Sequence, residues 1–166
     1  MTVWRALHPP LLRYLTVRGD EAPEDIASET WMHVVRGLAG FTGDAAAFRA
    51  WLFTIARHRA IDQARARSRR PVVAMGEPAA LPARELEPSA EEQVVEKDAT
   101  TRALELVATL PPAQAEMVML RVVAGLDVVD VATLVDKRPG AVRVAVHRAL
   151  QTLARHPDAR ADREVV

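Results

Sequence analysis

Hydrophobic side chains recur along most of the chain every three or four residues, which is the spacing of one face of an α-helix. Even the valine-rich stretch at residues 128–135 follows this spacing, because Val128, Val131, Ala132 and Val135 fall on one helical face. Alternating apolar runs are short, and aromatic residues make up 4% of the chain, so strand signals are weak. The pattern predicts an all-α protein.

Turn and capping residues divide this pattern into a series of helices. Pro23 suits the first turn of a helix, and Asp127 suits an N-cap. Pro9 and Pro10, which follow His8, are expected to bend or break the first helix. The predicted helices span residues 2–17, 23–39, 45–69, 89–110, 112–124, 128–135 and 139–155.

Residues 71–98 differ in composition from the rest of the chain, because they combine several prolines with a cluster of acids. This composition is typical of an extended, flexible linker. The sequence therefore predicts two small helical domains, at residues 1–70 and 99–156, joined by that linker. A charged tail is expected at residues 157–166.

The formal net charge is zero, but the charges are segregated into blocks. Residues 49–70 carry seven arginines against one acid, Asp62, whereas residues 71–98 carry seven acids against two basic residues. Arginines concentrated on one helix give the electrostatic pattern of a nucleic-acid-binding surface. The zero net charge therefore does not argue against a nucleic-acid partner.

Several function classes find no support in the residues. Cysteine is absent, which excludes disulfides and thiolate metal sites and suits a reducing compartment. The histidines lack metal-ligand spacing, and no glycine-rich phosphate loop or nucleophile elbow is present, so we expect no enzymatic activity, no cofactor and no metal. No apolar run approaches the ~20 residues of a membrane span, and the N-terminal residues do not resemble a signal peptide, so we expect no membrane insertion.

A short helix, a tight turn and a longer basic helix at residues 128–155 form a helix-turn-helix pattern. Ala132 is small, which allows the two helices to approach closely. One stripe of the second helix is expected to pack inward: Val142, Val146, Ala149, Leu150 and Leu153. The opposite face is expected to enter a DNA major groove: Arg143, Val144, His147, Arg148, Gln151 and Arg155.

The side chains of this outer face have the chemistry of base readout. Arginine and glutamine form paired hydrogen bonds with guanine and adenine edges, and Lys137 and Arg138 near the helix start suit phosphate contact. Val144 either meets a thymine methyl group or is simply an exposed valine. For the face as a whole, the alternative is an amphipathic helix whose polar side is solvated.

Two stretches together resemble a known family. EDIASETWMHVVRGLAGF, followed by FRAWLFTIARHRAIDQARARSRR, resembles the second conserved region of bacterial RNA polymerase sigma factors of the extracytoplasmic-function (ECF) type, within the sigma-70 family. LPPAQAEMVMLRVVAGLDVVDVATLVDKRPGAVRVAVHRAL resembles their fourth region. The resemblance covers residues 4–70 and 95–155, and the acidic, proline-rich stretch lies where the family has its linker.

The resemblance implies that the second region binds core RNA polymerase. In the family, an acidic helix docks on a coiled coil of the largest polymerase subunit. Carboxylates and an aromatic side chain suit contact with a basic coiled coil. From the residues alone, an ordinary acidic helix start and a tryptophan in the core remain alternatives. The residues at these positions are Glu24, Asp25, Glu29, Trp31 and Val34.

The resemblance also implies that the arginine-rich helix opens and reads the −10 promoter element. The loop FTGDA before this helix is where the family captures an extruded base. Arg59 lies on the apolar stripe of the helix and is expected to pair with Asp62, and Trp51 is expected in the core. The side chains turned away from that stripe are expected to be free to contact unpaired bases and phosphates: Arg57, His58, Ile61 and Arg65.

The fourth region departs from the family pattern in and after its turn. The family usually has glycine in the turn, and here it is Asp136, which tolerates a left-handed backbone better than most residues. An apolar residue usually follows, and here it is Lys137. Ala141 and Ala145 replace a common threonine and a common arginine, which removes contacts to phosphates or bases and leaves the −35 sequence undetermined.

These features lead to one functional hypothesis and one rival. The chain is expected to be a cytoplasmic promoter-specificity factor for transcription initiation, which binds core RNA polymerase, reads the −35 duplex and the single-stranded −10 element, and promotes strand opening. The family also implies an anti-sigma partner. The rival is a dimeric helix-turn-helix transcription regulator with an N-terminal effector or dimerisation module, which leaves the arginine-rich helix and the acidic linker unexplained.

Overall fold

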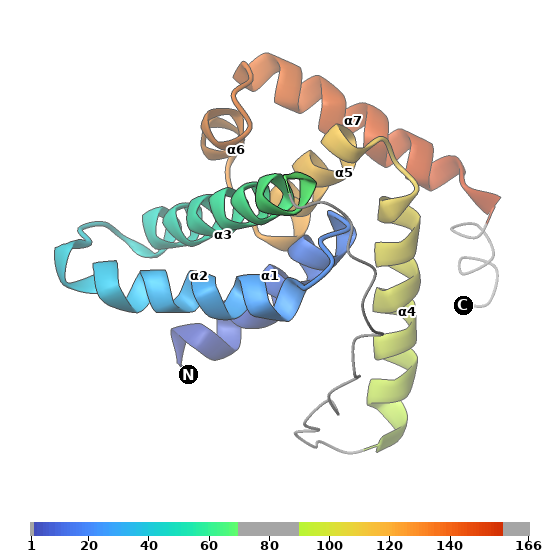
Figure 1. Cartoon of the computed structure of the whole chain (residues 1–166). Helices are drawn as coiled ribbons and strands as arrows, with labels where there is room; N and C mark the ends of the chain where they lie inside the picture. Colours follow the sequence, from blue (N-terminus) through green and yellow to red (C-terminus); the bar gives the residue numbers. More distant parts are fainter. Residues whose placement is uncertain (1, 70–89, 158–166) are drawn as a thin grey trace.

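The protein is a two-unit assembly of helices, and its computed structural model describes residues 2–69 and 90–157 (Figure 1). The helices α1 to α3 form the first unit, and the long α4 leads into the second unit, which is completed by α5 to α7. No strand occurs within the described ranges, so the predicted all-α class with two helical units is confirmed. The elements are α1 (Val3–Val17), α2 (Pro23–Gly37), the 3₁₀-helix η1 (Leu38–Gly40), α3 (Ala45–Ser68), α4 (Ala90–Ala108), α5 (Pro112–Val118), the π-helix η2 (Met119–Val123), α6 (Val128–Leu134) and α7 (Pro139–Arg155).

The long helix α4 begins at Ala90, one residue after the start of the helix predicted at 89–110. Its first residues, 90–98, overlap the end of the segment predicted as a linker. The rest of that segment, and the predicted tail beyond residue 157, lie outside the described residues. Among the described helices, none combines the length and the apolar composition that a bilayer crossing requires.

The first helix runs unbroken through Pro9 and Pro10, so the predicted break does not occur. Each proline lacks the N–H that would bond to the carbonyl four residues earlier, which frees the carbonyls of Arg5 and Ala6. Both of these residues are exposed, so water is available to those carbonyls. On the opposite side of α1 the core side chains hold the helix in place: Leu7, Leu11, Tyr14 and Leu15.

The core of the first unit lies between α1, α2 and α3. The carboxylate of Asp44 caps α3 by accepting a hydrogen bond from the Ala47 N–H at 2.8 Å. Phe53 on α3 packs edge-to-face on Tyr14 of α1, with ring centroids 5.5 Å apart. The buried side chains of α3 are Leu52, Phe53, Ala56 and Ala60.

The second unit contains the predicted helix-turn-helix in α6 and α7. The Asp127 carboxylate caps α6 by accepting from the Asp130 N–H at 2.7 Å, as predicted. Val142 and Ala149 are fully buried, but Leu150, predicted to pack inward, is 44% exposed. The buried side of α7 is centred on Val142 and Ala149, and Leu150 lies 100° further round the helix. Ala145 packs against the core on the other edge of this stripe.

The turn between α6 and α7 is closed by a left-handed residue. Asp136 has a φ of 54°. The Lys137 N–H donates to the Ala132 carbonyl at 2.9 Å, and the Asp136 N–H donates to the Thr133 carbonyl at 3.4 Å. These two bonds define a Schellman motif, in which the left-handed position is usually glycine. The aspartate found there therefore takes the conformation that the family's glycine would take.

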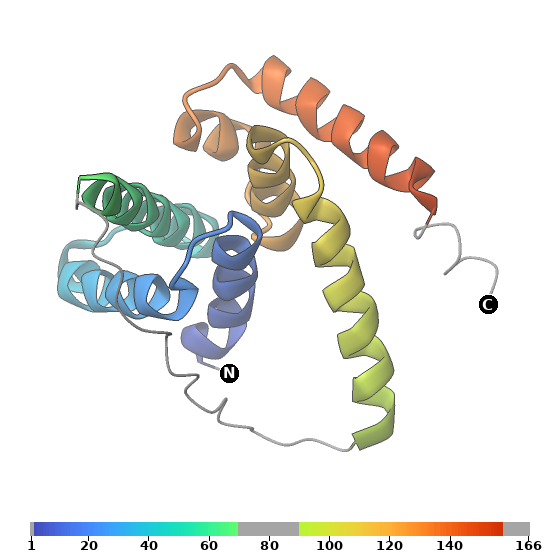
Figure 2. The same ribbon diagram turned by 45° about the vertical axis from the view of Figure 1, so that its right-hand side comes forward.

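One continuous cluster of buried apolar side chains extends through both units. The contacts between the units are made chiefly by α1, which touches α4, α5 and η2 as well as α2 and α3. Figure 2 shows α1 between the rest of its own unit and α4. The two units are thus packed together rather than held apart.

Substitution of Asp136 tests the left-handed turn. We expect Asp136→Val to lower the free energy of unfolding by about 1–2 kcal/mol, because a β-branched residue is strained at positive φ. Asp136→Gly is the matched control and should change it by less than about 0.5 kcal/mol, since the relief of strain opposes the entropy that glycine loses on folding. Urea unfolding followed by circular dichroism measures both, and equal losses in the two variants would contradict the assignment.

Candidate nucleic-acid interface

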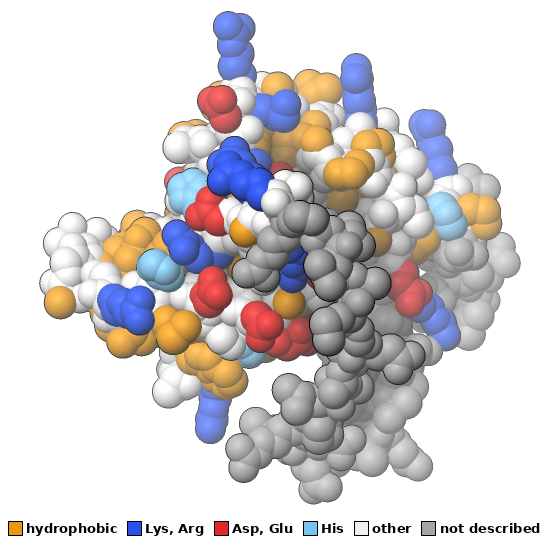
Figure 3. Space-filling model, in the orientation of Figure 1, with side chains coloured by type: hydrophobic (Ala, Val, Ile, Leu, Met, Phe, Trp, Pro, Cys, Tyr) orange, Lys and Arg blue, Asp and Glu red, His pale blue; other side chains and the backbone are white. Residues whose placement is uncertain are grey.

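The outer face of α7 and the turn before it form an exposed basic surface. Figure 3 shows Lys and Arg side chains projecting from the edge of the molecule along which α7 runs. Pro139 occupies the first helical position, and no side chain caps α7, so its first-turn N–H groups are not taken up by a cap. The residues predicted to contact the −35 element are all exposed: Lys137, Arg138, Arg143, Val144, His147, Arg148 and Gln151. This face therefore presents its polar groups outward in the state described.

The basic helix α3 presents a second, less open surface. Of the residues predicted to contact the −10 element, His58 and Arg65 are exposed, whereas Arg57 and Ile61 are half-buried. Arg59 pairs with Asp62 at 3.5 Å, as predicted. Near the end of the helix, Arg67 Nη1 lies 2.6 Å from Glu21 Oε2, an ion pair that the sequence did not indicate.

The loop before α3 is held by an aromatic cluster. Phe41 stacks on Trp51 with ring centroids 4.9 Å apart, and Phe48 meets both rings edge-on. Trp51 is half-buried and packs against the core, in line with its predicted structural place. Gly43 has a φ of 153°, and a Cβ there would lie 2.8 Å from the Ala47 Cβ, so the loop fits only glycine at this point. Thr42, Gly43 and Asp44 remain exposed.

A carboxylate from the second unit occupies the basic side of α3. Glu116 of α5 accepts hydrogen bonds at its Oε1 from Tyr14 Oη at 2.9 Å, from Arg18 Nη1 at 2.6 Å and from Arg57 Nε at 2.9 Å. Arg18 is also bonded to Asp20 at 3.1 Å. We call this group the Glu116 cluster: Tyr14, Arg18, Asp20, Arg57 and Glu116. Arg57 is therefore not free, contrary to the expectation from its helical face.

Burial and charge in the Glu116 cluster oppose each other. Burial by itself raises the pKa of Glu116, but the hydrogen bond from Arg57 and the charges of Arg18 and Arg57 outweigh it, so the pKa lies below its ordinary value. Burial and the neighbouring carboxylate raise the pKa of Tyr14. At neutral pH the glutamate is therefore ionised and the phenol remains a neutral donor.

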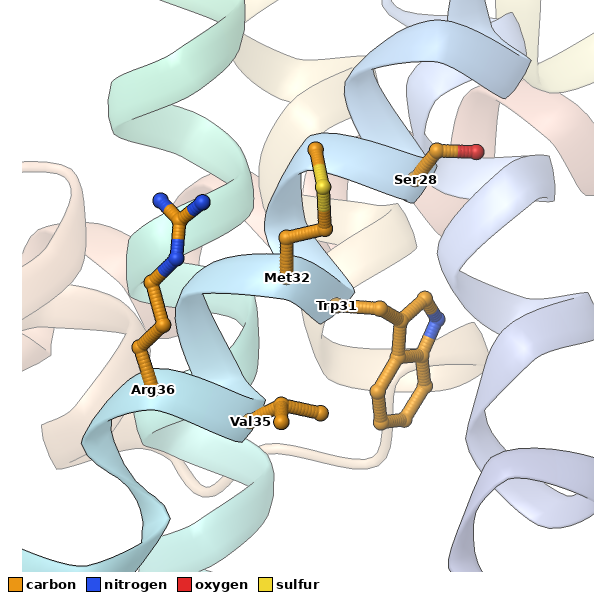
Figure 4. Close-up of a pocket in the computed structure, with 5 residues that line it drawn as sticks. All are labelled: Ser28, Trp31, Met32, Val35 and Arg36. Carbon is orange, nitrogen blue, oxygen red and sulfur yellow. The ribbon is translucent and has the colours of Figure 1, made fainter.

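A shallow apolar groove lies on the outer side of α2. Its volume is about 320 Å³. Figure 4 shows Trp31, Met32 and Val35 projecting from this helix. The Trp31 indole donates from Nε1 to Nδ1 of His8 at 3.2 Å, which fixes the ring at the edge of the groove. The residues that line the groove are Ser28, Trp31, Met32, Val35 and Arg36.

The residues predicted to contact polymerase divide between surface and core. Glu24, Asp25 and Glu29 are exposed, and Trp31 is half-buried. Val34 is 3% exposed and belongs to the core, so its side chain does not reach a partner in this conformation. Its neighbour Val35 and Met32 are exposed instead. The helical phase of Ile26, Thr30 and Val34 would have revealed this from the sequence.

Metal ligation finds no support at these surfaces. Among the described residues, no three His, Asp or Glu side chains lie close enough together to hold a metal ion.

Two family profiles match the chain in order. Residues 3–70 match Sigma-70 region 2, and residues 100–153 match Sigma-70, region 4. These ranges coincide with the two helical units and with the stretches on which the resemblance was based.

The chain is also similar to individual curated proteins. It is 38% identical over 142 residues to the ECF RNA polymerase sigma factor BldN of Streptomyces coelicolor. The aligned region covers 86% of this chain and 53% of BldN. It is 35% identical over 163 residues to the ECF RNA polymerase sigma factor SigD of Mycobacterium tuberculosis, which covers 91% of this chain and 73% of SigD. The chain thus spans about half the length of BldN.

A solved structure has a similar arrangement of helices. The sigma factor RpoE of Bartonella quintana, crystallised with the anti-sigma factor NepR, matches with a TM-score of 0.61 over 91% of each chain. The sequence identity is 21%, so this match supports a similar fold and nothing further.

Proposed function

Because the chain belongs to the ECF RNA polymerase sigma factors of the sigma-70 family, we propose that it acts in the cytoplasm as a promoter-specificity factor for transcription initiation. It binds core RNA polymerase, reads the −35 and −10 elements, and promotes strand opening. The observation that carries this proposal is the presence, on one chain, of an exposed recognition face on α7 and an arginine-rich face on α3.

The −35 element is bound as duplex by α7. Arg148 and Gln151 lie on the exposed face one turn apart, where paired hydrogen bonds to base edges are possible. Lys137 and Arg138 flank the start of the helix and suit phosphate contact, together with the first-turn N–H groups. Ala141 and Ala145 contribute no polar group, so readout depends on the remaining side chains.

The −10 element is bound as single strand by α3 and the loop before it. His58 and Arg65 are exposed on the same helix, and Ile61 offers an apolar edge between them. Cations follow the phosphates while an apolar or aromatic surface receives the base. Binding of the open strand shifts the equilibrium toward the unpaired state, so no chemical reaction is required of this chain. We therefore propose that it has no enzymatic activity of its own.

Core polymerase is bound by the outer side of α2. Met32, Val35 and the edge of Trp31 give the apolar centre of this surface, and Glu24, Asp25 and Glu29 give an acidic rim. An apolar centre with a charged rim is the usual composition of a protein interface. We also propose an anti-sigma partner, because the similar sigma factor of Bartonella quintana was crystallised with one.

Association with core polymerase distinguishes a sigma factor from a dimeric regulator. We expect the purified chain to be retained stoichiometrically by core RNA polymerase and to direct specific run-off transcription from a genomic promoter library. A dimeric regulator would instead bind a palindromic duplex alone. Failure of both retention and transcription would contradict the proposal.

Arg148→Ala should weaken discrimination among −35 variants. A bidentate contact to guanine is worth about 1–3 kcal/mol, so a preferred −35 sequence should lose roughly fivefold or more of its advantage. Competition binding by the polymerase holoenzyme measures this. The control is Arg13→Ala, which removes an exposed arginine from α1 and should leave discrimination unchanged. Arg102 is not used as the control, because it already makes a contact within the chain. Equal discrimination by wild type and Arg148→Ala would remove Arg148 from the recognition face.

Arg65→Ala should weaken strand opening without affecting polymerase binding. Arg65 is a cleaner test than Arg57, because its side chain is exposed and lies outside the Glu116 cluster. Loss of one phosphate contact to a single strand should reduce the slope of log affinity against log salt by about 0.7. Permanganate reactivity of unpaired thymines, followed against salt, measures this. Opening like that of wild type, with Arg13→Ala as the reference, would exclude Arg65 from the −10 surface.

A further inference from the structure

The Glu116 cluster joins the two units, which in the proposed function bind different promoter elements. Glu116 belongs to the second unit, whereas Tyr14, Arg18 and Arg57 belong to the first. Their side chains are largely covered, with Glu116 12%, Arg18 17% and Arg57 22% exposed. A DNA phosphate therefore has no access to these donors while Glu116 is in place.

The three donors are arranged for an anion rather than for this glutamate alone. The hydroxyl of Tyr14 and the guanidinium groups of Arg18 and Arg57 converge on one oxygen, Oε1, within 2.6–2.9 Å. Arginine binds carboxylate and phosphate oxygens by the same geometry. The Arg18 guanidinium also lies over the Tyr14 ring, 5.7 Å from its centroid. This contact keeps Tyr14 and Arg18 together independently of the second unit.

We propose that Tyr14, Arg18 and Arg57 form an anion site that holds Glu116 in the closed chain and a backbone phosphate of the unpaired −10 strand in the open chain. Arg57 lies on the same helix as His58 and Arg65, so a phosphate bound there continues the basic track of α3. This inference rests on the proposed function for its ligand. It adds Tyr14 of α1 and Arg18, the residue that follows α1, to the DNA-contacting surface.

One further polar contact at the boundary between the units is unfavourable in the closed chain. The Arg49 side chain lies against Gly125, where a Cβ would be 2.7 Å from Nη1. Its Nε is buried without a hydrogen-bond partner among the described residues. A buried unpaired donor opposes closure, whereas the Glu116 ion pairs and the shared apolar core favour it. A ligand that binds only the open state then shifts the population toward it.

The closed state is measured without polymerase. The chain has no cysteine, so Ala39→Cys and Ala154→Cys, both at exposed positions, provide two unique labels for single-molecule energy transfer between the units. Glu116→Gln preserves shape and removes the charge, and Glu105→Gln is the control, since it makes the same change at an exposed site on α4. We expect the open population to rise roughly fivefold or more in Glu116→Gln and to stay unchanged in Glu105→Gln.

The DNA half of the proposal has its own measurement. Affinity for a short fluorescent single-stranded oligodeoxynucleotide of mixed sequence should rise several-fold in Glu116→Gln, because the internal competitor is gone. Adding Arg18→Gln to that variant should reverse the gain, whereas adding Arg13→Gln, at an exposed α1 position, should not. Inorganic phosphate at matched ionic strength is the reference ligand. The oligonucleotide should raise the open population of the wild-type chain at a far lower concentration than inorganic phosphate does.

Two results would overturn the inference. Unchanged energy transfer and unchanged DNA affinity in Glu116→Gln would show that the cluster does not hold the units together. A gain in affinity that survives Arg18→Gln, or an oligonucleotide no more effective than inorganic phosphate, would remove DNA from the site. Neither measurement contains polymerase, so failure of the chain to bind core polymerase would refute the proposed function and leave these outcomes to be judged separately.

Discussion

The Glu116 carboxylate is the interaction on which the arrangement of the two units depends. A charged group that is taken out of water needs compensating partners, and removing one of them leaves the others buried and unpaired. Here the partners come from α1 and α3, so the position of α5 is fixed relative to both helices. The apolar contacts of α1 with α4, α5 and η2 add area, but they are not directional. The ion pairs therefore add a directional contact to an otherwise apolar boundary.

In this arrangement the two surfaces proposed to bind DNA differ in exposure. The outer face of α7 is exposed along its length, whereas α3 has part of its basic side covered by the second unit. The physical reason is that carboxylate and phosphate oxygens accept hydrogen bonds from the same donors. The Glu116 carboxylate of α5 occupies donors that could otherwise bind a phosphate. Where a protein carries both signs of charge in separate blocks, as this chain does, its own carboxylates compete with an external polyanion.

The departures of the fourth region from the family pattern have local explanations. Asp136 adopts a φ of 54° and completes the Schellman motif, so the turn is preserved without glycine. Ala145 packs against the core at the edge of α7, whereas Ala141 is exposed in the first turn. The framework of the motif is thus retained while two polar groups are absent from it.

The sequence by itself determined the helices and the outward face of α7, because both depend on local periodicity and on helix-start residues such as Pro23 and Asp127. The misplaced Val34 could have been corrected from its helical phase, but other predictions failed because a neighbour not visible in the local pattern decides the outcome. Pro9 and Pro10 are tolerated because packing on the other side of α1 holds the helix, and Arg57 is occupied because α5 approaches it. The Glu116 cluster joins residues as far apart in sequence as Tyr14 and Glu116, and no periodicity relates such positions. Only the tertiary structure decided that contact, since it is fixed by how two amphipathic units pack and not by the conformation of either segment.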